Sequence, residues 1–205
     1  SNTGPIVKLS NATGGALSVS DYTTGGSLAS SPGLALATDG SLFVSDQTYN
    51  FSTSIASGPV KEFDSGGMFF LELIFDGSSG LSGPAGMVID GDTLFTASKM
   101  NGDILKTDLN TSITTVFAST GATFEAGVLA MLSDGSVITG SASGNGNIYH
   151  FGLDGTLLGT FASGLGQVGG IAAIPEPKTY VTIFSALALL TVLVARNRRR
   201  TSSSN

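Results

Sequence analysis

Residues 86–96 read GMVIDGDTLFT, and this stretch decides the fold. Two apolar runs flank Asp90-Gly91. An Asp-Gly pair in this setting predicts a β-hairpin, because a type I′ turn needs φ > 0 at both central residues. Similar phrases begin at residues 33 and 127, and a shortened copy occupies 170–174. The sequence predicts hairpin turns at four pairs: Asp39-Gly40, Asp90-Gly91, Asp134-Gly135 and Asp154-Gly155.

These hairpins belong to a longer repeat. A second apolar phrase recurs at residues 6, 60, 104 and 148. A further apolar strand follows each of its copies: Ala16–Tyr22, Met68–Phe75, Ile113–Ala118 and Thr156–Ala162. The first phrases begin 53, 41 and 43 residues apart and the second phrases 54, 44 and 44 apart, so a single insertion explains the long spacing. The polar stretch Gln47–Ser57 is the natural place for it.

Four short strands in each repeat are typical of the blades of a β-propeller. We therefore predict an all-β, β-propeller-like fold of stacked four-stranded blades, with full blades at 33–75, 86–118 and 127–162. Two strands precede them and one follows. Glycine and alanine in each first strand suit the crowded centre where blades converge. Apolar side chains at alternate positions should share one face of the first blade: Leu34, Leu36, Leu42 and Val44. A β-sandwich and a parallel solenoid remain as alternatives.

Over residues 4–174 the repeats are similar to NHL, SMP-30 and streptogramin-lyase-like propellers, although no copy carries a complete diagnostic motif. Propellers usually close by completing the last blade with a strand from the other chain end. Here the two ends together provide the third, fourth and first strands of such a blade. The chain also begins at Ser1 without a basic and apolar leader. We therefore expect a fragment, or a protein whose leader has been removed.

The C-terminal residues 174–200 combine three features. A Pro-Glu-Pro motif precedes an uncharged apolar run, Thr179–Ala195, and an arginine cluster follows it. As a helix the run spans roughly 25 Å, the short end of what crosses a bilayer core. By the positive-inside rule the arginines stay in the cytoplasm, so the body before the motif lies outside it. The motif is Pro175, Glu176 and Pro177, and the basic residues flanking the helix are Lys178, Arg196, Arg198, Arg199 and Arg200.

This three-part tail resembles the PEP-CTERM sorting signal of Gram-negative bacteria. The resemblance implies recognition by exosortase, a membrane-embedded protease-like enzyme that cuts near the motif, and an association with exopolysaccharide and biofilm. It also implies an exported protein, first anchored by the C-terminal transmembrane helix and then located in the cell envelope or outside the cell. Residues 201–205 are expected to be a disordered tail, where the family usually stops sooner. An ordinary C-terminal membrane anchor is the alternative.

The composition of residues 1–174 narrows the possible partners. They hold 14 acidic and 4 basic residues, a net charge of −10, which argues against binding nucleic acid or anionic polysaccharide through bulk electrostatics. The chain contains no cysteine, which excludes disulfides, thiolate metal sites and a cysteine nucleophile. We expect no cofactor and no bound metal.

Candidate catalytic groups are few. Propeller lactonases and lyases place acids, asparagine or histidine around the central channel, where these groups hold a metal or act as a base. The corresponding loops here contain Asp46, Lys99, Asn101, Asn145 and Asn147. Asparagine and aspartate also form turns for purely structural reasons. The single histidine, His150, occupies a strand position expected to face solvent. We therefore expect no catalytic residues and a scaffold that binds exopolysaccharide or a surface protein. A surface-displayed lactonase or lyase is the alternative.

Overall fold

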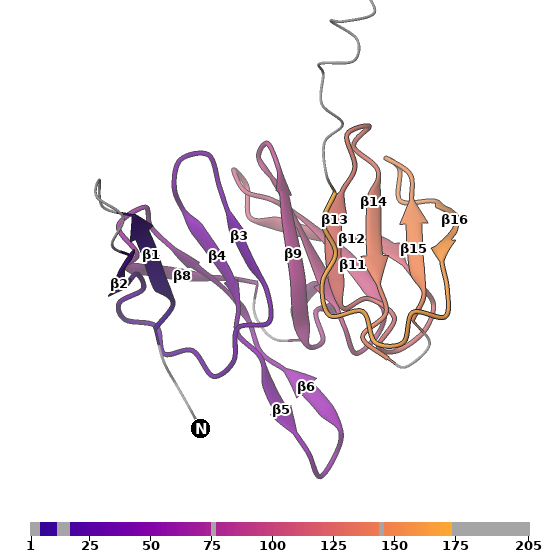
Figure 1. The fold of residues 1–205 in the computed structure, drawn as a ribbon, viewed down its shortest axis with the longest axis horizontal. Coiled ribbons are helices and arrows are strands. Elements are labelled where there is room, and N and C mark those ends of the chain that lie inside the picture. Colours follow the sequence, from indigo (N-terminus) through magenta and orange to yellow (C-terminus); the bar gives the residue numbers. More distant parts are fainter. Residues whose placement is uncertain (1–4, 12–16, 75–76, 144–145, 174–205) are drawn as a thin grey trace, which may run out of the picture. The chain divides into compact units, whose positions relative to one another are not determined.

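The computed structural model describes residues 5–11, 17–74, 77–143 and 146–173 (Figure 1). Contacts divide the chain into two units, Ser1–Ala173 and Ile174–Asn205. The predicted sorting motif, membrane helix and arginine cluster all belong to the second unit and lie outside the described residues. Within the described ranges, no helix has the length and apolar character that crossing a membrane requires.

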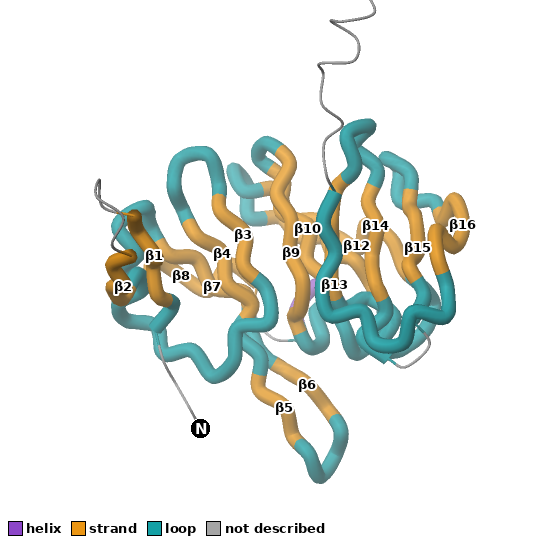
Figure 2. Tube along the Cα trace, viewed as in Figure 1, coloured by secondary structure: helices purple, strands orange, loops and turns teal. Residues whose placement is uncertain are grey.

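Three four-stranded antiparallel sheets make up most of the first unit, as Figures 1 and 2 show. Blade 1 consists of β3 (Leu34–Leu36), β4 (Leu42–Ser45), β7 (Val60–Phe63) and β8 (Phe69–Ile74). Blade 2 consists of β9 (Pro84–Asp90), β10 (Thr93–Ser98), β11 (Asp103–Asp108) and β12 (Ile113–Ser119). Blade 3 consists of β13 (Val128–Met131), β14 (Val137–Gly140), β15 (Ile148–Phe151) and β16 (Leu157–Ala162). The helical content of the described residues is the 3-10 turn η1 (Ser78–Gly80).

The prediction of three full blades preceded by two strands is confirmed. The two strands are β1 (Val7–Asn11) and β2 (Leu17–Asp21), which pair with each other. The strand predicted at 170–174 is wrong for residues 170–173, which form no strand, and residue 174 lies outside the described residues. After β16 the Val168 N–H donates to Ser141 O at 3.0 Å. The chain therefore returns along the end of blade 3, and no described strand pairs with residues 170–173.

The Asp-Gly hairpins form where the sequence predicts them, but the predicted turn type is wrong. At Asp39, Gly40 N–H donates to Ala37 O at 3.1 Å, and Ala37 N–H donates to Ser41 O at 2.9 Å. The φ of Gly40 is 92°, whereas Asp39 is not among the residues with positive φ. This arrangement is a three-residue loop, a type I turn followed by a glycine bulge. The same hydrogen-bond pattern recurs at the Asp134 and Asp154 turns.

The fourth turn is shorter. Thr93 lies opposite Asp90, so the loop between β9 and β10 contains only Gly91 and Asp92. Gly91 has φ 54°, while Asp92 is not among the residues with positive φ. A positive φ at the first central residue alone is a feature of type II′ turns and not of type I′ turns.

The blades pack face to face through apolar side chains that alternate along each strand. On β10, Leu94 faces blade 1 and belongs to a buried cluster with Phe43 and Val60, whereas Phe95 belongs to the cluster shared with blade 3. On β11, Leu105 and Ile104 divide in the same way. The two central strands of blade 2, β10 and β11, therefore bury apolar side chains on both faces.

The first strands of the three blades lie closest together. β9 contacts both β3 and β13. Gly86 N–H on β9 donates to Gly127 O at 2.9 Å, a backbone hydrogen bond between two blades. A Cβ built on Gly86 would lie 2.6 Å from Val128 Cα and 2.8 Å from Leu129 N. The predicted reason for small residues in the first strands, crowding at the centre, is confirmed at this glycine.

The outer face of blade 1 is only partly covered. Leu42, Val44 and Phe63 form a buried cluster there with Leu28, and Tyr22 and Phe69 pack against it. Leu34 pairs with Val44 and Leu36 with Leu42, so these leucines share one face, as the alternation predicts. They are nevertheless 48% and 65% exposed. The covering residues reach the second strand of the blade but not the innermost one.

Each blade has a buried serine at the end of its second strand or directly after it. These serines are Ser45, Ser98 and Ser141, and none of them has exposed surface. Ser45 Oγ accepts the Gly33 N–H at 2.7 Å, and Ser98 Oγ accepts the Ser82 N–H at 2.8 Å. Ser141 Oγ accepts the Ser143 N–H at 3.1 Å. In blades 1 and 2 the serine satisfies the backbone of the segment leading into the first strand.

The insertion predicted within Gln47–Ser57 forms a hairpin of its own. β5 (Thr48–Asn50) and β6 (Ile55–Ser57) pair with each other in a separate two-stranded sheet. Along the chain they come between β4 and β7, the second and third strands of blade 1, which pair directly with each other. Figure 1 shows this hairpin extending beyond the ends of the neighbouring blade strands. Blade 1 is therefore complete without it.

Candidate functional site

Three of the predicted candidate residues directly follow or lie close to the end of a second strand. Asp46 comes directly after β4, Lys99 comes directly after β10, and Asn101 lies in the β10–β11 turn. Asn147 immediately precedes β15, at the same end of blade 3. Asn145 lies outside the described residues. The repeat thus places the described candidates at one end of the blades, where side chains from several blades can meet.

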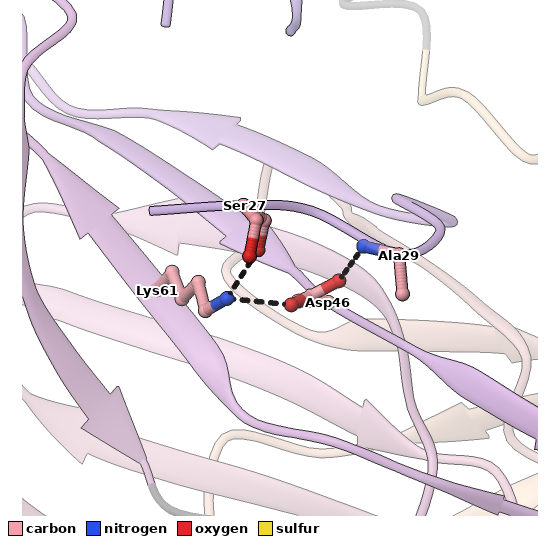
Figure 3. A network of polar contacts seen from close by, with 4 residues as sticks. All are labelled: Ser27, Ala29, Asp46 and Lys61. Atoms are coloured by element: carbon pink, nitrogen blue, oxygen red, sulfur yellow. Dashed lines mark hydrogen bonds and ion pairs between the residues drawn. The ribbon is translucent and has the colours of Figure 1, made fainter. Parts of the chain in front are cut away.

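Asp46 takes part in a buried ion pair (Figure 3). Its Oδ2 lies 2.7 Å from Lys61 Nζ, and the two side chains are 9% and 10% exposed. Lys61 Nζ also donates to Ser27 O at 2.6 Å, while Asp46 Oδ1 accepts the Ala29 N–H at 2.6 Å. The pair therefore fastens the segment entering blade 1 onto β4 and β7. Both charges are used in this structural role.

The two described asparagines also make local structural contacts. Asn101 Nδ2 donates to Gly80 O at 2.7 Å, and its Oδ1 accepts the Asp103 N–H at 3.2 Å. Asn147 Nδ2 donates to the hydroxyl of Tyr149 at 3.1 Å. The bond from the Asp103 N–H is typical of an asparagine in a turn, whereas Asn147 contacts a side chain two positions further along the chain.

A small cavity of about 140 Å³ lies at this end of the blades. Its polar side chains are Gln47, Lys99 and Gln167, and its floor includes Ala85 and Val128 from the first strands of blades 2 and 3. Gln47 Nε2 donates to Pro84 O at 2.9 Å, and Lys99 Nζ lies 5.6 Å from the centroid of the Phe124 ring. Ammonium and amide groups can hydrogen-bond a small polar ligand. The lining residues include no carboxylate that could hold a divalent cation there.

A second hollow, of about 170 Å³, lies among the hairpin turns of blades 1 and 2 and is acidic. Asp39, Glu62 and Asp92 line it. Burial raises the pKa of the Glu62 carboxyl, and the charge of Asp39 raises it further. Among the described residues, no three His, Cys, Asp or Glu side chains are arranged as a metal site.

His150 is half-buried, so its side chain is only partly exposed at the strand position that the sequence predicts to face solvent. Its Nε2 lies 2.8 Å from Ser136 Oγ, and its ring makes an edge contact with the Phe161 ring at 6.2 Å. The reason is local: β15 places His150 opposite Ile138, beside the turn that contains Ser136. An outward-facing strand position is therefore covered by its neighbours.

Ser136 bridges His150 to an aspartate. Its hydroxyl donates to Asp134 Oδ1 at 2.6 Å, and this hydrogen bond is the main cause of the lowered pKa of Asp134. In a catalytic triad the histidine stands between serine and aspartate, whereas here the serine stands between the other two. Asp154 makes the same bond to the Thr156 hydroxyl without any histidine, and its pKa is lowered for the same reason. The arrangement is a turn motif.

Sequence reasoning found Asp46 but missed Lys61 and Gln47. Lys61 lies on a strand and pairs with a residue 15 positions away, so no local motif marks it. The sequence feature that could have marked Lys61 is its rarity, because it is one of only four basic residues among the first 174.

Comparisons with known proteins bear on the fold. No protein-family model matches the chain, and no curated protein matches it. Among solved structures, a chain of a nidogen/laminin complex matches with a TM-score of 0.60 at 19% identity, over 82% of this chain and 62% of that one. Regucalcin from Agrobacterium tumefaciens, described as a calcium-binding protein, matches with a TM-score of 0.53 at 16% identity, over 68% of this chain and 47% of its own.

A protein from Lactobacillus plantarum matches with a TM-score of 0.51 at 14% identity, over 75% of this chain and 48% of its own. These neighbours have propeller-like folds. The fold of the described residues is therefore propeller-like. The chain spans 62%, 47% and 48% of the lengths of the three matched chains. At these identities the likeness concerns the fold alone.

Proposed function

We propose that the propeller-like unit is a non-catalytic scaffold that binds a matrix component or a surface protein outside the cytoplasm. The supporting observation is that three of the described candidate side chains are engaged in contacts within the fold. Asp46 forms an ion pair with Lys61, Asn101 donates a hydrogen bond to the Gly80 carbonyl, and Asn147 donates one to the Tyr149 hydroxyl. A catalytic acid, base or metal ligand must instead reach a reacting group, together with other groups converging on the same point.

A panel of lactone, ester and glycoside substrates, assayed with added calcium, tests this proposal. We expect no turnover by the purified chain. The alternative, a lactonase or lyase, predicts turnover that is lost in Asn101→Ala or Asn147→Ala. Asn110→Ala is the matched control, because Asn110 lies at the β11–β12 turn and bonds Asp92 at 3.1 Å. Turnover that depends on Asn101 or Asn147 but not on Asn110 contradicts the scaffold.

We further propose that the chain is exported and sorted through its C-terminal residues, as an exosortase substrate. The three-part order of motif, apolar run and arginines supports this. We expect the surface-located protein to end near Pro177 when it is produced in a host with the sorting enzyme.

Mass spectrometry of the mature C-terminus measures that outcome. Alanine at Pro175, Glu176 and Pro177 should leave the protein in the membrane fraction with its tail intact. Alanine at Thr201, Ser202 and Ser203 is the control and should not change processing. Recovery of surface protein that still carries Arg196–Arg200 contradicts the proposal and supports an ordinary anchor.

A further inference from the structure

The β5–β6 hairpin is an addition to the repeat and carries the most exposed aromatic ring of the described residues. Phe51, at its tip, is 87% exposed, the highest fraction among the large apolar side chains that the structure describes. Tyr49 lies beside it, with ring centroids 4.9 Å apart and planes at 77°. Blade 1 does not need this hairpin for its own pairing. A stability role therefore does not explain why an aromatic residue stands there.

The hairpin is anchored firmly at its base. Ala56 on β6 is 1% exposed and lies against Gly83, where an added Cβ would come within 2.9 Å of the Ala56 Cβ. At the start of the hairpin, Gln47 N–H donates to Ser30 O at 2.7 Å. Asp46 N–H donates to Pro59 O at 2.9 Å and so joins the chain entering the hairpin to the chain leaving it. The hairpin is thus held at the boundary between blades 1 and 2.

The tip is also held in one conformation. Asn50 Oδ1 accepts the Ser52 N–H at 2.9 Å and the Thr53 N–H at 3.3 Å, and these bonds close the turn around Phe51. A turn ordered before binding loses less conformational entropy when a ligand arrives. The exposed ring is therefore presented in advance of binding.

The chemistry around the ring is neutral and polar. The sequence from Gln47 to Pro59 holds no charged residue, in a body with a net charge of −10. Most exposed neighbours of Phe51 carry hydroxyl or amide groups, namely Thr48, Asn50, Ser52, Thr53 and Ser54. The apolar exception is Ile55, which is 51% exposed. Charge complementarity favours a neutral ligand here, because the acidic body repels polyanions and anionic lipid surfaces.

Size decides between a sugar and a protein partner. Phe and Tyr bury about 150–250 Å² each, and Tyr49 is already partly buried, so the two rings together offer less than about 500 Å². A specific protein interface buries about 800 Å² on each side. A pyranose ring needs only one aromatic face for its C–H groups, with hydroxyl and amide side chains to meet its rim.

From these observations we propose that the β5–β6 hairpin, with Phe51 as its platform and Tyr49 beside it, is a binding site for neutral polysaccharide. This inference rests on the proposed scaffold function and names its ligand class. Each hairpin contacts one or two sugar units, so binding to a single oligosaccharide is weak. Many sites on one polymer strengthen the attachment through effective concentration.

Affinity electrophoresis of the full chain in gels containing dextran, amylose or galactomannan tests the site. We expect retardation by at least one of these polymers, and at least a tenfold weaker affinity for Phe51→Ala, as for an aromatic hot-spot residue. Phe51→Trp should retain binding, because it keeps the ring. Phe70→Ala is the matched control, since Phe70 on β8 is 65% exposed and should not contribute.

The thermal midpoint should be unchanged in Phe51→Ala, because its side chain is almost fully exposed, so weaker binding cannot come from unfolding. Absence of binding to all three polymers overturns the inference, and so does equal binding by Phe51→Ala. Binding to neutral phosphatidylcholine vesicles that depends on Phe51, without polysaccharide binding, replaces it with a membrane contact. Polysaccharide binding that does not depend on Phe51 contradicts this site but is consistent with the proposed scaffold function. Turnover in the substrate panel contradicts the scaffold function itself.

Discussion

Asp46→Ala is expected to lower the free energy of unfolding by about 3–5 kcal/mol, because it leaves the buried ammonium of Lys61 without its counter-charge. Lys61 is 8% exposed, and its remaining contact is the carbonyl of Ser27 at 2.6 Å. The substitution also frees the Ala29 N–H that Asp46 accepts. Urea denaturation of the wild type and the variant measures the difference.

A double-mutant cycle separates the ion pair from the packing around it. Asp46→Leu and Lys61→Met, each made alone, should cost a similar amount, since each leaves one buried charge without its partner. The double variant Asp46→Leu with Lys61→Met should recover much of the loss, because an apolar pair needs no desolvation of charge. Asp21→Ala, at an exposed aspartate on β2, should change stability by less than about 0.5 kcal/mol. A cost below about 1 kcal/mol for Asp46→Ala matches a solvated surface pair and contradicts the buried one.

Gly86→Ala is expected to cost about 2–3 kcal/mol through overpacking between blades 2 and 3. The new methyl group would meet the backbone at Val128 Cα, 2.6 Å away, and backbone cannot rotate aside as a side chain can. Moving it also strains the inter-blade hydrogen bond from Gly86 N–H to Gly127 O. Equilibrium denaturation measures this cost directly.

Gly169→Ala is the control for the same chemical change. Gly169 has no atom within 4 Å of a built Cβ and no positive φ, so alanine there should be neutral or slightly stabilising. If Gly86→Ala proves as mild as Gly169→Ala, the first strands are not as close as the structure places them.

The blades could be predicted from the sequence because each repeat states the same pattern in different residues. The alternation that sends Leu94 to one neighbour and Phe95 to the other is visible as an apolar run, and glycine marks the centre. The turn type could not be predicted from Asp-Gly alone. The turn type depends on how many residues separate the last paired positions of the two strands. That register, Leu36 with Leu42 in blade 1, is set by the packing of the folded sheet and not by the Asp-Gly pair.

The candidate site was predicted only as a set of positions. The repeat placed Asp46 and Lys99 correctly at one end of the blades, because repeats preserve position. It could not show that Asp46 is neutralised by Lys61, since ion pairs across strands leave no periodic signal. It also could not show that His150 is covered by Phe161, because bulges shift the pairing of β15 with β16.

The order of strands within each sheet has a consequence for how the chain folds. Blades 2 and 3 pair only segments that follow one another along the chain, so each hairpin closes a short loop at little entropic cost. A polypeptide emerging from its N-terminal side can therefore complete one sheet before the next appears. Once β12 has emerged, the apolar cluster between blades 1 and 2 already has all of its strands. Blade 3 can then dock onto a surface that has already formed, so we expect assembly to proceed in the direction of synthesis.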